Sequence, residues 1–264
     1  FWRYTVWAVV AAVLFVGFLS YALILRGRRR ESWALLWREE RGLILRCELV
    51  FLVAFLFSLL LRLGNPDLWH PINGGEKPME FGFLNAILRS PTMPPYDPFF
   101  SGGHVNYYYY GLFLVSTLVK LTGLAPAVAF NLIIPTLFAL TVSGAYAVVA
   151  TLTGKHVFGW IGGVLTAFVG PLSGAVTVRG RGGFGEVIAA LQRLADPQTQ
   201  GGLARTWQGF WRWLGPQILP LRTDWFWDAS RTHGPYENTI TEFPFWSFLF
   251  ADLHPHTINI PFTI

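Results

Sequence analysis

The chain has 264 residues, of which 53% are hydrophobic and 13% charged, and its formal net charge is +5 at pH 7. Soluble domains usually carry about 25% charged residues, so this composition argues against a water-soluble globular protein and favours a membrane protein. The single cysteine, Cys47, excludes an internal disulfide and a thiolate metal cage.

Three stretches of the sequence are apolar for long enough to cross a bilayer. No charged residue occurs in Tyr4–Leu25, Leu121–Gly154 or Val157–Val178, and a spanning helix needs about 20 apolar residues. A helix at the edge of a soluble core would instead show polar residues at helical period. The sequence therefore predicts an all-α integral membrane protein, built as a polytopic helical bundle.

Both ends of the chain are apolar and no initiator methionine is present, so we expect one membrane domain, residues 1–264, that is a fragment of a longer protein. The predicted spans cover residues 3–25, 43–63, 106–122, 127–152, 157–177 and 241–264. An outer loop, residues 64–105, and a polar, Gly- and Trp-rich interfacial segment, residues 178–240, separate some of these spans. Glycines of the fifth span, such as Gly159 and Gly163, predict close helix packing.

Arginines set the predicted orientation, because seven of them lie between Arg26 and Arg46. A basic cluster can bind nucleic acid, but between two spans it is explained by the positive-inside rule. Residues 26–46 are then cytoplasmic and the loop 64–105 is outside. We expect a multi-pass protein of the cell membrane, in a prokaryote the cytoplasmic membrane, with lipid and not nucleic acid as partner. The oligomeric state stays open.

The outer loop concentrates carboxylates and aromatic residues beside the bilayer. Glu80 opens a short helix, "MEFGFLNAILRS", whose apolar face we expect on the membrane surface, and the helix dipole favours a carboxylate in that first turn. Prolines stiffen the backbone around Asp97. The loop returns through "NYYYYG", and aromatic rings of this kind form walls for sugar rings or anchor in lipid headgroups. The simpler alternative is a solvated loop without a site.

A second polar group lies in the last apolar run, "EFPFWSFLFADLHPHTINIPF". It contains Asp252, His254 and His256, and ionisable side chains in such a run are costly and often functional. One interpretation is a metal site. The other is a network in which these groups satisfy one another within the bundle.

The loop resembles the first outer loop of polyprenyl-dependent glycosyltransferases of the C fold, such as lipid A aminoarabinose transferases and protein mannosyltransferases. In these, an acidic residue, a surface helix and a proline-containing return follow the first core helix, as Glu80, "FGFLNAILRS" and "PPYDPFFSGGHVNYYYYG" do here. More closely, the chain resembles the uncharacterised multi-pass "YYY" membrane proteins (DUF2298). The motifs shared with them are "NGGEKPM", "DP", the tyrosine triplet, "EFPF" and "DLHPH".

The resemblance implies transfer of a sugar from a polyprenyl-phosphate donor, with inversion, and an outer-loop carboxylate as general base. The implied catalytic candidates are, in order, Glu80, Asp97 and Glu76. The implied substrate-binding candidates are Lys77, Arg89, His104, Asn106, Tyr107, Tyr108, Tyr109, Asp252, His254 and His256. A divalent cation, Mg²⁺ or Mn²⁺, could bridge carboxylates and phosphate. The alternatives are a transporter or flippase for a lipid-linked or anionic solute, and a non-catalytic scaffold.

Overall fold

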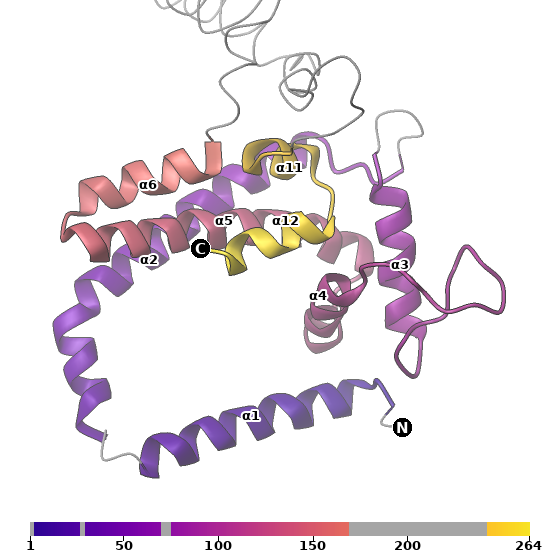
Figure 1. Ribbon diagram of the computed structural model, residues 1–264, viewed down its shortest axis with the longest axis horizontal. Helices are drawn as coiled ribbons and strands as arrows, with labels where there is room; N and C mark the ends of the chain where they lie inside the picture. Colours follow the sequence, from indigo (N-terminus) through magenta and orange to yellow (C-terminus); the bar gives the residue numbers. More distant parts are fainter. Residues whose placement is uncertain (1–2, 27–29, 70–74, 169–241) are drawn as a thin grey trace, which may run out of the picture. The chain divides into compact units, whose positions relative to one another are not determined.

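The computed structural model describes residues 3–26, 30–69, 75–168 and 242–264, so the predicted interfacial segment, residues 178–240, lies outside the described ranges. Contacts divide the chain into two compact units, Phe1–Ala167 with Ser247–Ile264, and Phe168–Trp246. Every regular element of the described residues is a helix (Figure 1). The predicted all-α membrane architecture is confirmed.

Helices α1, Val6–Arg26, α2, Arg30–Gly64, and α5, Pro126–Thr153, contain the long apolar segments. Among the described residues, Val6–Leu23, Trp37–Gly64 and Pro126–Thr153 are long and apolar enough to cross a bilayer. Helix α2 packs against α5, and the buried Arg62 links their ends by donating to Asn131 Oδ1 at 2.5 Å. The predicted spans 3–25, 43–63 and 127–152 overlap α1, α2 and α5, and α2 begins at Arg30, before the predicted start.

Within the described residues, two further apolar helices extend over less than the thickness of a bilayer. Helix α4, Tyr110–Thr122, and the described part of α6, His156–Phe168, have 13 residues each, about 20 Å at the helical rise. The predicted span 106–122 starts too early, because the first tyrosines precede the helix and Tyr109 is its N-cap. In α6, a Cβ on Gly159 would lie 2.9 Å from the Tyr146 carbonyl oxygen, so glycine permits the expected close packing on α5.

The predicted span 241–264 is not one helix. Its described residues form α11, Pro244–Phe250, α12, Pro255–Asn259, and the 3₁₀ turn η1, Ile260–Phe262. The break lies at Ala251, which has φ 63°, and at His254, whose ψ of 150° is extended. Pro255 disfavours a helical conformation of the residue before it, His254, and it has no N–H to continue a helix. The helix is therefore interrupted before Pro255, although the sequence stays largely apolar.

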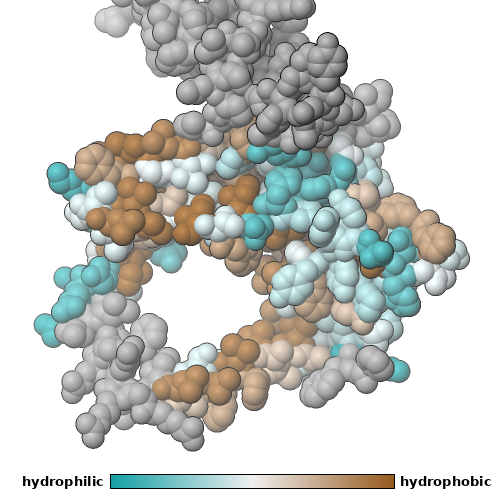
Figure 2. Space-filling view, viewed as in Figure 1, coloured by the Kyte–Doolittle hydropathy of each residue, from teal (hydrophilic) through white to brown (hydrophobic). Residues whose placement is uncertain are grey.

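Helix α3, Lys77–Arg89, packs against α4 and α5. Its residues Phe83, Leu84 and Ile87 are buried in the protein, which corrects the expectation that the apolar face lies on the membrane surface. The sequence correctly predicted an apolar face on this helix, but that face packs against other helices and not against lipid headgroups. Figure 2 shows apolar surface instead along α1 and α6, where large side chains such as Phe18 and Leu165 are exposed.

Candidate functional site

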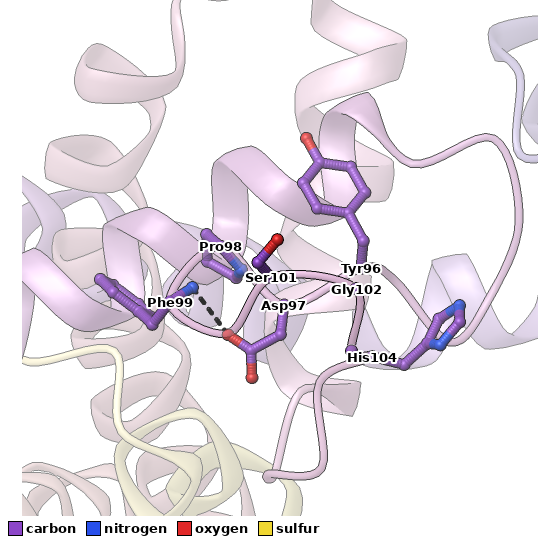
Figure 3. Close-up of a pocket in the computed structure, with 8 residues that line it drawn as sticks. Tyr96, Asp97, Pro98, Phe99, Ser101, Gly102 and His104 are labelled. Atoms are coloured by element: carbon purple, nitrogen blue, oxygen red, sulfur yellow. Dashed lines mark hydrogen bonds between the residues drawn. The ribbon is translucent and has the colours of Figure 1, made fainter.

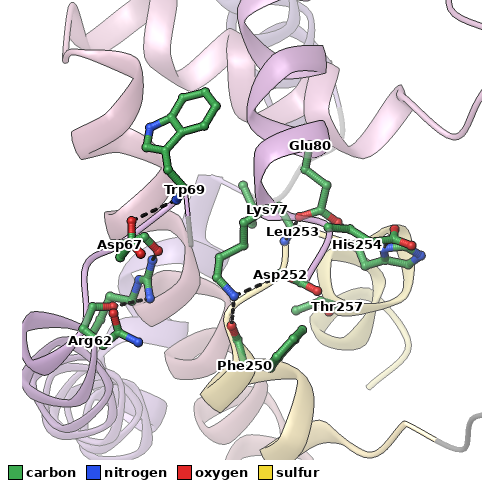
Figure 4. Close-up of polar contacts among 12 residues, drawn as sticks. Arg62, Asp67, Trp69, Lys77, Glu80, Phe250, Asp252, Leu253, His254 and Thr257 are labelled. Carbon is green, nitrogen blue, oxygen red and sulfur yellow. Dashed lines mark hydrogen bonds and ion pairs between the residues drawn. The ribbon is translucent and has the colours of Figure 1, made fainter. Parts of the chain in front are cut away.

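The first turn of α3 and the connection between α11 and α12 bring ionisable side chains together (Figure 4). Glu76, Lys77 and Glu80 come from the first segment, and Asp252 and His254 from the second. Helix α3 begins here because Pro78 suits an N-terminal helical turn. The break after Phe250 turns backbone and side chains of the second segment toward it.

Glu80 is the most deeply buried ionisable side chain of this group, with 2% of its surface exposed. Its Oε2 accepts the backbone N–H of Leu253 at 2.7 Å, and its Oε1 lies 3.1 Å from His254 Nδ1. Burial raises the pKa of this carboxyl, while the bonds from His254 and Leu253 oppose that rise. Glu80 is therefore oriented by its partners and has little contact with solvent.

Glu76 is the accessible carboxylate, with half of its side chain exposed. Its Oε2 lies 2.9 Å from the same His254 Nδ1 that approaches Glu80. A ring nitrogen of His254 thus stands between a buried and an exposed carboxylate. These three residues, Glu76, Glu80 and His254, are called the Glu–Glu–His cluster.

Lys77 and Asp252 form an adjacent ion pair in which both side chains are largely buried. The Nζ donates to the Phe250 carbonyl at 2.6 Å and to Asp252 Oδ1 at 3.4 Å, and it stands 4.2 Å from the Phe250 ring centre. Burial, followed by the charge of Glu80, raises the pKa of Asp252 to about 7, which outweighs the lowering by Lys77. Burial also lowers the pKa of Lys77.

Aromatic side chains border the cluster on one side. Tyr107 stacks on Phe83 with ring centres 5.8 Å apart, and its hydroxyl lies 3.5 Å from His254 Nε2. Tyr108 and the neighbouring Asn106 are exposed, while Tyr109 is half-buried. Of the predicted tyrosines, Tyr107 is the one whose hydroxyl reaches the cluster.

Among the described residues, His256 has hydrogen-bond partners on a different side from the two carboxylates that approach His254. Its Nε2 lies 3.0 Å from Ser247 Oγ and 3.2 Å from Thr257 Oγ1. These hydroxyl partners fit the predicted network of mutually satisfied polar groups better than they fit a role of His256 as a metal ligand. Arg89 is exposed at the last residue of α3, nine residues beyond Glu80, which is about 14 Å along the helix axis.

Asp97 lies in a different place, a tight loop from Tyr96 to His104 (Figure 3). Its Oδ1 accepts the backbone N–H groups of Phe99 and Phe100 at 2.8 and 3.2 Å, so this carboxylate stabilises its own turn. Among the described residues, Asp97 has no hydrogen bond or ion pair with the Glu–Glu–His cluster. The loop borders an open pocket of about 570 Å³ lined by Tyr96, Asp97, Pro98, Phe99, Ser101, Gly102, Gly103 and His104.

Sequence reasoning missed three contributors to the cluster and to the adjacent ion pair. The Leu253 amide and the Phe250 carbonyl act through the main chain, and Phe83 supports Tyr107 through its ring. The motif "DLHPH" marked the neighbourhood of the first two. No residue-type pattern identifies which backbone group faces a carboxylate, because that depends on where the helix breaks.

The long apolar helices define the class of the chain as a multi-pass membrane protein. Several of its ionisable side chains, including the buried Glu80 and Lys77, gather in one polar site. The chain matches, over residues 1–264, the family described as "Uncharacterized membrane protein (DUF2298)", and it belongs to that family. The suspected family is thus confirmed. Comparison with curated proteins and with solved structures gives no significant match.

Proposed function

We propose that the Glu–Glu–His cluster is the catalytic centre of a membrane glycosyltransferase that uses a polyprenyl-phosphate-linked sugar. The observation that carries the proposal is the convergence of Glu76 and Glu80 on His254, from segments far apart in sequence. Such convergence of ionisable groups, one of them buried, costs folding energy and is typical of functional sites. The sequence resemblance to glycosyltransferases of the C fold supplies the reaction class.

The accessible carboxylate, Glu76, is the group best placed to take a proton from the acceptor. As the acceptor oxygen or nitrogen bonds to the anomeric carbon, its proton passes to Glu76. The bond from that carbon to the phosphate oxygen breaks, and the polyprenyl phosphate leaves with the electron pair, inverting the anomeric centre. Glu80 is a positioning residue here, because both of its oxygens have partners. Its predicted role as the base itself stays a prediction.

The leaving phosphate needs a neighbouring positive charge, which the two carboxylates of the cluster do not supply. Lys77 is buried and engaged with Phe250 and Asp252, and Arg89 stands at the far end of α3. Tyr107 offers a partly exposed ring beside the cluster for stacking on a sugar. By the positive-inside rule, we propose that this face of the protein is the outer one, where lipid-linked donors are used.

The test is transfer of a radiolabelled sugar from polyprenyl phosphate by membranes containing the full chain. Glu76→Gln is expected to lower transfer about 10²- to 10⁴-fold, the usual contribution of a general base. Asp97→Asn is the matched control and should retain near-normal transfer, since that carboxylate supports a separate turn. Unchanged transfer in both Glu76→Gln and Glu80→Gln would exclude the cluster as the catalytic centre.

A transporter or flippase is the second candidate, and one observation favours it. The connection Ala251–His254 interrupts a run of apolar sequence and carries Asp252 and His254, and discontinuous helices with ionisable groups are typical of transporter sites. Proteoliposomes containing the chain separate the two functions. Movement of a labelled lipid-linked sugar across the bilayer without new glycosidic product would favour transport.

A further inference from the structure

The Glu–Glu–His cluster offers three donor atoms of the kinds that bind metal ions. One atom from each of Glu76, Glu80 and His254 lies within 4.8 Å of the other two. The Nδ1 atom of His254 is 2.9 Å from one carboxylate oxygen and 3.1 Å from the other. Ligands at about 2.0–2.2 Å from a shared ion lie about 3 Å apart when they are neighbours in its coordination shell.

Charge around the buried carboxylate supplies an independent reason for a cation. Glu80 is 2% exposed, so water cannot screen it. The nearby ammonium of Lys77 is paired with Asp252 and with the Phe250 carbonyl. A cation bound at Glu80 Oε1 would balance the charge of this buried carboxylate where water does not reach it.

The surroundings already orient the buried ligand as metal sites require. The Leu253 amide holds Glu80 Oε2 at 2.7 Å, which leaves Oε1 directed toward His254. Partners of this kind fix a ligand's direction and tune its affinity. Glu76, half exposed, leaves the site open on one side, so a bound ion would keep positions for an outside ligand.

We propose that Glu76, Glu80 and His254 bind one divalent transition-metal ion, Mn²⁺ or Zn²⁺, with open coordination positions for an anionic oxygen. Two carboxylates and one imidazole suit these ions better than Mg²⁺, which prefers oxygen ligands and water. Asp252 stays outside the ligand set because it pairs with Lys77, and His256 faces Ser247 and Thr257. Binding of the ion does not depend on sugar transfer, whereas a role in holding donor phosphate rests on the proposed function. Glu76 would bind the ion through Oε2, the oxygen beside His254, and Oε1 would remain to take the acceptor proton.

The binding test uses the full chain in detergent after removal of metal by a chelator. Titration with Mn²⁺, followed by the loss of its free electron paramagnetic resonance signal, should show one ion per chain. Zn²⁺ should compete for the same site. Glu76→Gln is the main variant, because Glu76 is half exposed and its replacement should leave the fold intact. We expect at least a tenfold weaker affinity.

Controls match the lost chemical group. Glu40→Gln removes an exposed carboxylate on α2, and His104→Ala removes an exposed imidazole in the 96–104 loop. Both should bind Mn²⁺ as the wild type does, whereas His254→Ala should bind weakly. No stoichiometric binding of either ion, or equal binding by Glu76→Gln and the wild type, would overturn the metal site.

A second measurement separates this inference from the proposed function. Sugar transfer is assayed in chelator-treated membranes and again after addition of Mn²⁺. Recovery of transfer by Mn²⁺ in the wild type supports both ideas. Stoichiometric binding without any transfer would support the metal site and count against glycosyl transfer. Transfer that persists in a preparation that binds no ion would overturn the metal site and leave the transferase standing.

Discussion

The Glu–Glu–His cluster and the 96–104 loop contain the same kinds of residue but use them differently. In the cluster, Glu80 is buried and its partners come from a segment more than 170 residues away in sequence. In the loop, Asp97 accepts bonds from backbone groups two and three residues ahead. A carboxylate whose partners are local stabilises a turn. One that gathers distant ionisable partners into a buried place is the stronger functional candidate.

The two regions are nevertheless joined by one aromatic side chain. The buried Phe83 of α3 contacts Phe99 of the loop edge-on, with ring centres 5.6 Å apart, and stacks on Tyr107 beside the cluster. The loop therefore supports the wall of the site without contributing its carboxylate. Comparable substitutions in the cluster and in the 96–104 loop test whether the two regions differ in this way.

The largest difference is expected when each acidic side chain is removed. Glu80→Ala leaves the buried Leu253 amide without its acceptor and removes one of the two carboxylates beside His254, which should lower the free energy of unfolding by about 3 kcal/mol. Asp97→Ala loses bonds in an open turn and should cost about 1 kcal/mol or less. Unfolding by SDS in mixed micelles measures both. Equal losses would contradict the distinction between the regions.

A double-mutant cycle tests the neighbouring ion pair. Lys77→Met alone leaves the buried Asp252 carboxylate without its ammonium and should cost about 2 kcal/mol. In the Asp252→Asn background the same change should cost less, giving a coupling of about 1–2 kcal/mol. The same micelle unfolding assay supplies all four free energies. Additive effects would show that the pair does not stabilise the connection after α11.

Two glycines with positive φ provide a smaller, matched comparison. Gly75 has φ 60° and a Cβ there would lie 2.3 Å from the Phe250 ring, whereas Gly102 has φ 79° and open space. Alanine at either position pays about 1 kcal/mol for the left-handed conformation. Gly75→Ala should cost about 1 kcal/mol more, because the ring must move. Stability loss no greater than in Gly102→Ala would mean that this packing is loose.

The smallest effect is expected for His104→Ala. The loop is held by backbone bonds, from Asp97 N to Gly103 O and from Val105 N to Pro95 O, both 2.9 Å, and the His104 side chain is exposed. The unfolding free energy should change by less than about 0.5 kcal/mol. A loss comparable to that of Lys77→Met would show that the imidazole supports the fold.

Much of the helical architecture could be predicted, since apolar length specifies α1, α2 and α5 directly. The site was predicted in part. Glu76, Glu80, Asp252 and His254 were all candidates, and the structure brings them together, but Asp97 and His104 were grouped with them because they share a loop. The Asp97 carboxylate accepts bonds from its own turn, and its predicted catalytic role stays a prediction. His254 was treated as one of two similar histidines, and tertiary packing distinguishes it from His256.

By itself, the sequence determined that this chain is a helical membrane protein and which segments carry its chemistry, because apolar length and residue type are local properties. Tertiary structure alone decided that Glu80 is buried, that α3 packs on other helices, and that the connection after Phe250 places His254 between two carboxylates. Those features depend on contacts between segments far apart in the chain. Their energies come from burial and pairing, which no single segment possesses before the helices assemble.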